Sequence, residues 1–229
     1  FTRTMVPITC MDACKTQLFA GDTAGKPHVW TLLDGAVIAH ENDAFNGKSG
    51  CHTKSIECCQ LLEQENLFVT SSIDKTTRFW DIRSGDSTQV ISHNAHNETL
   101  QLDQFDLFMG NFAGGILHFD LRQLDQPLFT CHLNQRISSL RFDSHKLVVS
   151  ANRHVVIWDR KNLNQHRVAL RMRYHIHGLH FYDEKLITSD DSGNVLCWTP
   201  KKLPYLSKKA FLDKFIGDTN SINSPCIFQ

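Results

Sequence analysis

The sequence predicts an all-β fold, a β-propeller built from repeated four-stranded blades. Over most of the chain, apolar residues do not recur at helical spacing for long enough to predict a helix. Instead, an aromatic residue closes a short hydrophobic strand five times, with successive gaps of 50, 39, 39 and 40 residues. These aromatics are Trp30, Trp80, Phe119, Trp158 and Trp198. Aspartate directly follows three of them, and a period near 40 with that ending is typical of a propeller blade.

The first repeat is expected over residues 8–40. Its strand-forming segments are Ile8–Ala13, Gln17–Gly21 and His28–Leu32. A polar stretch rich in Asn, Gly and Ser, Glu41–Gly50, separates it from the next repeat. We expect this stretch to be an exposed insertion, because such residues favour loops.

The second repeat, residues 52–92, has the clearest pattern. Ile56–Leu62 is predicted to be its inner strand and Leu67–Ser71 its second strand, in which Phe68 and Val69 are good strand formers. A third strand is expected at Thr77–Asp81. The Ser84-Gly85-Asp86 turn then leads to an outer strand around Gln89–Ile91.

Three further repeats are expected at residues 96–131, 133–170 and 172–199. The third is looser, with strands at Leu107–Asn111 and Gly115–Asp120. The fourth and fifth follow the order of the second, with strands at Ile137–Phe142, Lys146–Ser150, His154–Asp159, Ile176–Phe181, Lys185–Ser189 and Asn194–Trp198. The remaining residues, 201–229, are expected to form a tail with a short amphipathic helix at Lys208–Ile216, followed by a flexible segment.

Composition narrows the functional classes. The 24 basic and 24 acidic residues cancel, so no global field draws the chain to nucleic acid or to a membrane surface. No apolar run approaches the ~18 residues of a membrane span. The eight cysteines include no Cys-x-x-Cys pair and show no finger-like spacing with the histidines. We therefore expect reduced thiols in a cytoplasmic or nuclear protein, with no metal and no cofactor.

The repeats resemble those of the WD-repeat family of β-propellers. The resemblance rests on Trp80-Asp81, on the Asp74 turn, and on Cys51-His52 where that family has Gly-His. It extends over about residues 8–199 and is most specific in the second repeat. The short links between the inner and second strands of the fourth and fifth repeats also resemble those of F-box WD proteins.

His52 and Asp74, together with a strand hydroxyl, could be read as a catalytic triad. However, their spacing matches the structural tetrad that the family resemblance implies, formed by His52, Asp74, Trp80 and a hydroxyl from Thr70 or Ser72. In such a tetrad, hydrogen bonds satisfy polar groups buried between blades. The other repeats do not reproduce it, since the aspartate position holds Ala113 in the third and Asn152 in the fourth. We therefore expect a structural role.

The number of blades is an open point. Propellers of the resembled family commonly have seven blades, which at about 40 residues each need roughly 280 residues. An open set of five would leave unpaired strand edges. We therefore expect the chain to be the C-terminal part of a longer propeller, cut at its N-terminus. A closed ring of five or six blades is the alternative.

Two sets of candidate interaction residues stand out. The first lies in the loops that gather around one mouth of a propeller, where a ligand can touch several repeats. It comprises Lys54, Lys75, Arg136, Asn152, Arg153, His175, Asp190 and Asp191. Arg136 and Arg153 are suited to carboxylates or phosphates, because guanidinium is a planar fork of donors. Ordinary solvated loop charges are the alternative.

The second set follows two of the strand-ending aromatics: Asp81 and Arg83, then Asp120 and Arg122. Asp159-Arg160 departs from the pattern, because its arginine comes one residue early. The Trp-Asp-x-Arg pattern resembles the motif by which WD-repeat substrate receptors dock on the adaptor of cullin-4-type ubiquitin ligases. A salt-bridged or solvent-facing strand end is the alternative.

These features favour a non-enzymatic protein-interaction platform, within which a substrate-recognition subunit of a cullin–RING ubiquitin ligase is the preferred prediction. Its partners would be a cullin-ligase adaptor and a substrate peptide. A scaffold for vesicle coat, ribosome biogenesis or chromatin is the alternative. RNA binding is disfavoured, since no clustered Lys/Arg stripe is present. An enzyme is not expected, because the sequence shows no paired carboxylates, glycine-rich phosphate loop or nucleophile elbow.

Overall fold

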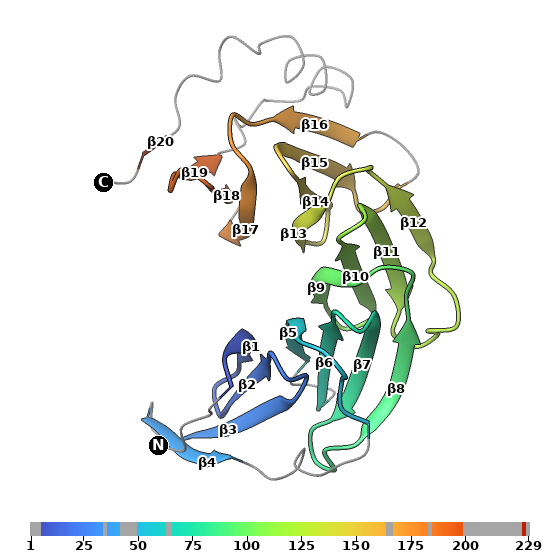
Figure 1. The fold of residues 1–229 in the computed structure, drawn as a ribbon. Helices are drawn as coiled ribbons and strands as arrows, with labels where there is room; N and C mark the ends of the chain where they lie inside the picture. The colour runs from blue at the N-terminus through green and yellow to red at the C-terminus, as the bar shows by residue number, and fades with distance from the viewer. Residues whose placement is uncertain are drawn as a thin grey trace. The chain divides into compact units, whose positions relative to one another are not determined.

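The chain is described by a computed structural model over residues 6–33, 36–41, 50–62, 66–163, 167–182, 185–198 and 226–227. Every regular element in these ranges is a β-strand, and the strands form five four-stranded sheets, here called blades 1 to 5 (Figure 1). The all-β propeller prediction is therefore confirmed. None of the described segments is a helix long and apolar enough to cross a membrane. The predicted helix at Lys208–Ile216 and most of the predicted insertion lie outside the described residues.

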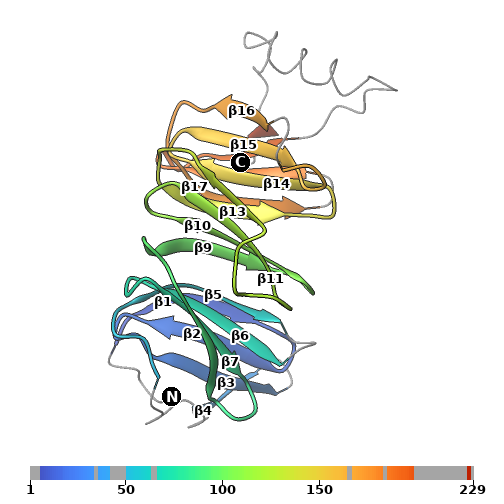
Figure 2. The same cartoon turned by 90° about the vertical axis from the view of Figure 1, so that its right-hand side faces the viewer.

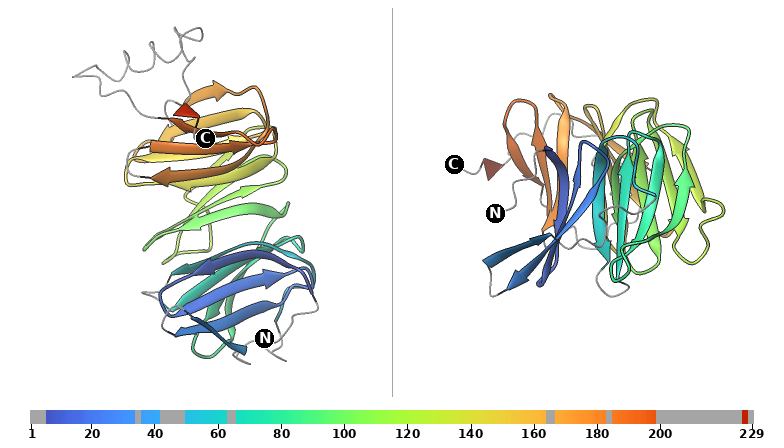
Figure 3. Two further views of the ribbon diagram at one scale, coloured as in Figure 1. Left: turned by 90° about the vertical axis from the view of Figure 1, so that its left-hand side faces the viewer. Right: turned by 60° about the horizontal axis from the view of Figure 1, so that its bottom comes forward.

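The chain divides into two compact units, unit 1 at Phe1–Ile137 and unit 2 at Ser138–Gln229. Unit 1 holds blades 1 to 3: β1 (Ile8–Ala13), β2 (Gln17–Asp22), β3 (Pro27–Leu33) and β4 (Ala36–Glu41); β5 (Ile56–Leu62), β6 (Leu67–Ser72), β7 (Thr76–Asp81) and β8 (Ser87–Ser92); β9 (Asn97–Leu102), β10 (Asp106–Asn111), β11 (Gly115–Asp120) and β12 (Phe129–His132). Within each blade, sequential strands are neighbours, as Figure 3 shows for blade 1 in blue.

Blades 4 and 5 belong to unit 2, apart from the first residue of β13. Their strands are β13 (Ile137–Phe142), β14 (Lys146–Ala151), β15 (His154–Asp159) and β16 (Arg167–Arg171); β17 (Ile176–Tyr182), β18 (Lys185–Asp190), β19 (Val195–Trp198) and β20 (Cys226–Ile227). The fourth position of blade 5 is taken by β20, which pairs with β19 from within the segment that the sequence predicted to be a tail.

Strand register explains the aromatic repeat. Trp80 pairs with Phe68, and the other four aromatics pair with the corresponding second-strand residues Leu18, Leu107, Leu147 and Leu186. Each aromatic therefore occupies the same place in its blade. In blades 1 to 4 most of the second strand is buried on both faces, as in β6, where only Leu67 is partly accessible. Such strands read as continuous apolar runs rather than alternating ones.

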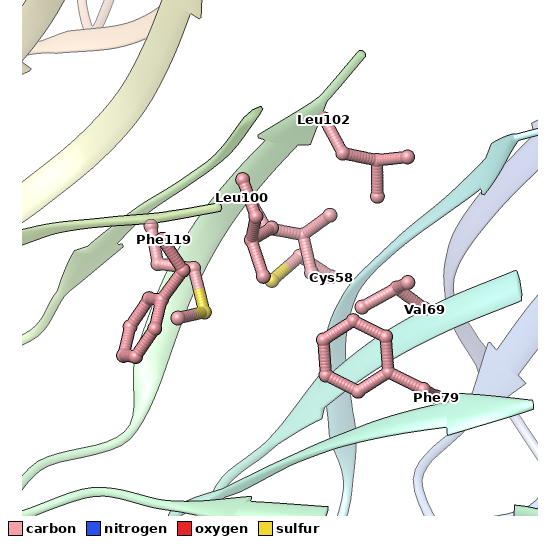
Figure 4. Close-up of a cluster of buried hydrophobic side chains, with 8 residues drawn as sticks. Cys58, Val69, Phe79, Leu100, Leu102 and Phe119 are labelled. Atoms are coloured by element: carbon pink, nitrogen blue, oxygen red, sulfur yellow. The ribbon is translucent and has the colours of Figure 1, made fainter. Parts of the chain in front are cut away.

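Hydrophobic clusters hold the blades of each unit together. Between blades 1 and 2, Phe19 and Val29 pack against Phe68 and Trp80, all at most 1% exposed. Between blades 2 and 3, eight buried side chains form a larger cluster: Cys58, Val69, Phe79, Leu100, Leu102, Leu107, Met109 and Phe119 (Figure 4). Within unit 2, a third cluster joins blades 4 and 5 through Val148, Val155, Ile176, Leu179 and Leu186. Burial of this apolar surface is the main force that holds neighbouring blades together.

Hydrogen bonds also link the inner strands of neighbouring blades. The Asp12 carboxylate in β1 accepts the backbone N–H of Leu61 in β5 at 2.8 Å. The Gln60 amide in β5 bonds both the N–H and the carbonyl of Leu102 in β9, at 2.7 and 3.3 Å. Side chains thus supply the pairing that an inner strand lacks on its open edge.

The turn between the second and third strands has one residue with positive φ in every blade. This residue is Gly25 (φ 85), Lys75 (φ 67), Gly114 (φ 96), Asn152 (φ 57) and Gly193 (φ 81) in blades 1 to 5. At Gly25 a side chain is also excluded by space, because a Cβ there would lie 2.5 Å from the carbonyl oxygen of His52. This glycine therefore allows the turn of blade 1 to approach the segment that carries His52.

Candidate functional site

The predicted tetrad residues in blade 2 form a directed chain of hydrogen bonds. The indole N–H of Trp80 donates to the Thr70 hydroxyl at 2.8 Å. The Thr70 hydroxyl lies 2.8 Å from His52 Nε2, and His52 Nδ1 lies 3.0 Å from the Asp74 carboxylate. Because Asp74 is an acceptor, His52 carries its proton on Nδ1, and Nε2 is left to accept from Thr70. Every polar group in this hydrogen-bonded network is then satisfied.

Burial and hydrogen bonding set the charges of this network. Burial lowers the pKa of His52 below its ordinary value, and the adjacent carboxylate opposes this only in part. Burial disfavours ionisation of Asp74, but hydrogen bonds from Thr76, from the Thr53 N–H and from His52 outweigh it and lower its pKa to about 2. The network therefore contains a neutral histidine and an ionised aspartate near pH 7.

The same geometry argues against nucleophilic catalysis. Thr70 is 0% exposed and His52 is 4% exposed, so a substrate carbonyl has no route to the hydroxyl. The Thr70 oxygen also already accepts the Trp80 N–H. The arrangement can fix the segment before β5 against β6 and β7, and it leaves no accessible reactive atom.

Of the two hydroxyls that the sequence left open, the structure places Thr70 against His52. Ser72 lies two residues further along β6, where it donates to the Lys54 carbonyl at 2.9 Å and accepts the Asp74 N–H at 3.1 Å. Ser72 therefore shapes the same turn without being a link in the chain from Trp80 to Asp74.

Sequence reasoning missed two related pairs. In blade 5, Trp198 Nε1 donates to Thr188 Oγ1 at 3.1 Å, which reproduces the contact between Trp80 and Thr70. The signal was available, since a threonine stands ten residues before the tryptophan in both blades. In blade 1, His28 Nε2 lies 2.9 Å from the buried Asp22 carboxylate.

The two Asp-x-Arg motifs adopt the same turn. Asp81 accepts the backbone N–H of Arg83 at 2.8 Å, and Asp120 accepts that of Arg122 at 2.9 Å. Both aspartates pair with the first residue of the preceding strand, so they occupy equivalent positions in blades 2 and 3. Both arginines are exposed. The motifs therefore present two guanidinium groups from equivalent strand ends.

The two arginines differ in their surroundings. The Arg122 guanidinium forms a bidentate pair with Asp120, at 2.9 and 2.5 Å, and lies 4.7 Å from the centre of the Phe105 ring. The hydrogen bonds from Arg122 lower the pKa of Asp120 to about 2. Among the described residues, no carboxylate forms an ion pair with the exposed Arg83, although its charge helps to lower the pKa of Asp81 after the hydrogen bonds from Ser84 and from the Arg83 N–H.

Three of the predicted mouth residues lie in unit 1. Lys54 and Lys75 are exposed in the loops around the tetrad. Arg136 is held by Glu98 at 2.5 Å, and its guanidinium carbon lies 5.4 Å from the centre of the Phe112 ring. His96 stacks on the same ring and also contacts Glu98 at 3.1 Å. Arg136 is thus part of a charged and aromatic cluster whose other members the sequence analysis did not select.

The other five mouth candidates lie in unit 2. The Asn152 carbonyl accepts the N–H of Ile176 at 2.9 Å, and the Arg153 carbonyl accepts that of Met172 at 2.7 Å. The His175 carbonyl accepts the N–H of Asp191, whose carboxylate forms an ion pair with His177. The Asp190 carboxylate accepts the N–H groups of Ser192 and Asn194, both at 3.0 Å. Most of these residues therefore shape turns, whereas the Arg153 side chain is exposed.

Comparisons with known proteins agree with this architecture. Residues 46–81, which contain the tetrad, match the family model for the WD domain, G-beta repeat. Over 184 residues, 79% of this chain, the sequence is 23% identical to F-box/WD repeat-containing protein 8 of Mus musculus, of which the match covers 30%. Over 128 residues, 52% of this chain, it is 31% identical to the U3 small nucleolar RNA-associated protein 15 homolog of Xenopus tropicalis, of which the match covers 24%.

Among solved structures, the crystal structure of the RRP9 WD40 repeats is similar, with a TM-score of 0.74 and 15% sequence identity over 87% of this chain and 62% of that one. This likeness supports the fold. The matches to the two relatives cover less than a third of each relative's length.

Proposed function

Because this chain belongs to the WD40-repeat family, we propose that it is a non-enzymatic protein-interaction platform and serves as a substrate-recognition subunit of a cullin–RING ubiquitin ligase. WD40 propellers generally act as interaction modules without catalytic activity, and the likeness to an F-box/WD protein agrees with the ligase assignment. The adaptor contact is assigned to the strand-end motifs, and the substrate contact to the exposed loop residues.

The observation that carries this proposal is the repeated Asp-x-Arg turn. Asp81 and Asp120 each fix the backbone N–H of an arginine two residues later, at equivalent ends of β7 and β11. The same turn recurs in blade 4, where Asp159 accepts the N–H of Lys161 at 3.0 Å. Arg83, exposed and held at its backbone, can present a planar fork of donors to carboxylates of a partner, whereas Arg122 would have to exchange its pair with Asp120 for the partner's carboxylate.

The test is affinity capture of the protein from cell extract, read by mass spectrometry. Wild-type protein should recover a cullin with its adaptor, and the double variant R83A/R122A should lose both. The matched control is K75A/R153A, which also removes two exposed positive charges but leaves the strand ends intact. If R83A/R122A still captured the adaptor, the docking role of these arginines would be refuted.

A scaffold in ribosome biogenesis is the second candidate. The 31% identity to the Xenopus tropicalis U3 small nucleolar RNA-associated protein 15 homolog favours it. The same capture distinguishes the two candidates. A stable assembly of ribosome-biogenesis proteins, recovered without a cullin and unaffected by R83A/R122A, would support the scaffold.

A further inference from the structure

The outer strand of blade 2, β8, is an edge strand that solvent can reach. It pairs with β7, and among the described residues no other strand pairs with it. It lies on the outer side of blade 2 in Figure 1, the side that faces the viewer in Figure 2. Most of its side chains are exposed, namely those of Thr88, Gln89, Val90 and Ser92.

The backbone of this edge offers hydrogen-bonding groups to a further strand. The ladder between β7 and β8 is regular from Gln89 to Ser92. Just beyond it, the His93 N–H donates to the Lys75 carbonyl at 2.8 Å, so His93 faces β7. In an antiparallel ladder, residues that face the partner strand alternate with residues that face away. The N–H and C=O groups of Val90 and Ser92 therefore point out of the blade.

β8 lacks the features by which natural proteins protect an edge strand, such as charged residues, proline and short length. Its six residues, Ser-Thr-Gln-Val-Ile-Ser, include no charged residue and no proline. By contrast, β16 begins and ends with arginine and β4 ends with glutamate, whereas β12 and β20 have only four and two residues. Among the outer strands that the structure describes, β8 is thus the long uncharged edge.

This edge is complementary to itself. A two-fold axis through Val90, perpendicular to the sheet, would place Val90 opposite Val90 of a second copy and Ser92 opposite Thr88. Each Val90 N–H would then donate to the Val90 carbonyl of the other copy. The two valines, each 44% exposed in the single chain, would cover each other. Because β8 carries no charge, no like charges would meet across the contact.

We propose that β8 is a dimerisation surface, at which two copies of this chain pair antiparallel about Val90 and join their second blades into one continuous sheet. Such an isologous contact uses the same surface of both copies. The inference is independent of the proposed ligase role and uses neither the tetrad nor the strand-end arginines. A single strand pair buries less than the roughly 1,200–2,000 Å² of a standard interface, so the dimer forms reversibly and depends on protein concentration.

The first experiment measures the mass of the purified protein by sedimentation over a concentration series up to about 0.1 mM. We expect the average mass to rise from 26.2 kDa toward twice that value. V90K should stay at the monomer mass, because two lysines would lie opposite each other. The matched control is T130K, which adds the same charge to an exposed position of the outer strand β12 and should dimerise like wild type.

A charge-reversal pair tests the register. V90K and V90E should each be monomeric, because each places like charges at the two-fold axis. An equimolar mixture of the two should form more dimer than either variant alone, because lysine would then lie opposite glutamate. A mixture that stays as monomeric as its components would refute pairing about Val90.

Amide exchange of the wild-type protein tests the surface without any substitution. The N–H groups of Val90 and Ser92 should exchange more slowly at high than at low protein concentration, whereas that of Thr130 should not change. The proposal is overturned if wild type stays monomeric throughout the series, if V90K dimerises as wild type does, or if the new protection lies outside β8. Protection of β8 that appears only when a different protein is added would also overturn self-pairing and assign the edge to that partner.

Discussion

Replacing Thr70 with valine removes the central link of the blade 2 network while keeping the shape of the side chain. Two hydrogen bonds of 2.8 Å are lost, one from Trp80 Nε1 and one to His52 Nε2. Each such bond contributes about 1 kcal/mol, and a buried N–H left without an acceptor adds about 1–3 kcal/mol. Since Trp80 is 0% exposed, water cannot replace the hydroxyl. We expect T70V to lower the free energy of unfolding by about 3–5 kcal/mol.

Blade 5 supplies the matched control. Among the described residues, the Thr188 hydroxyl bonds the Trp198 N–H, at 3.1 Å, and Trp198 is partly exposed, so water can take over the bond in T188V. We expect T188V to lower the free energy of unfolding by about 1 kcal/mol. Urea denaturation followed by circular dichroism measures both variants. The assignment of Thr70 as the central link is wrong if T70V destabilises the protein no more than T188V does.

Three further predictions follow from burial and backbone geometry. Burial lowers the pKa of His93 to about 4, below its ordinary value, so its contribution to stability is complete above pH 6.5 and is lost as the pH falls from 6.5 toward 4. At pH 5 the His93 contribution to this loss is about 2 kcal/mol relative to pH 7.5. Urea titrations at both pH values should therefore show a loss about 2 kcal/mol larger in wild type than in H93Q, and equal losses would contradict the prediction. G25A should destabilise the protein by more than about 2 kcal/mol, because its Cβ would lie 2.5 Å from the His52 carbonyl oxygen. The strain of a left-handed backbone conformation alone would cost at most about 2 kcal/mol. G193A, which meets nothing within 4 Å, should show only the strain of positive φ, about 1 kcal/mol, and equal thermal shifts in the two variants would argue against the steric explanation. F68A, at a fully buried position between blades 1 and 2, should lower the unfolding free energy by about 3–5 kcal/mol in urea denaturation, and a loss under 1 kcal/mol would show that the site is not tightly packed.

The repeat could be predicted from the sequence because each strand-ending aromatic occupies a fixed register. Trp80 opposite Phe68 and Trp158 opposite Leu147 are local pairs within one hairpin, so a short window of sequence contains both partners. The burial of β6 on both faces likewise appears in the sequence as a run of apolar and small residues.

The candidate site was less accessible to sequence reasoning. Thr70 and Ser72 are two residues apart in β6 and therefore lie on the same face of the strand. Only the position of the Trp80 indole distinguishes them. The pair of Glu98 and Arg136 joins residues 38 positions apart, and nothing in the local pattern links them. The predicted gathering of loop residues around one mouth remains a prediction, since Lys75 and Arg153 belong to different units.

The hydrogen bonds between inner strands have a consequence for amide exchange. The N–H of Leu61 belongs to blade 2, but its acceptor, Asp12, belongs to blade 1. The N–H of Leu102 depends in the same way on Gln60 of the preceding blade. Deuterium uptake at these two amides therefore reports the opening of the neighbouring blade as well as their own. A slow Leu61 amide would mean that blades 1 and 2 open together as one cooperative segment.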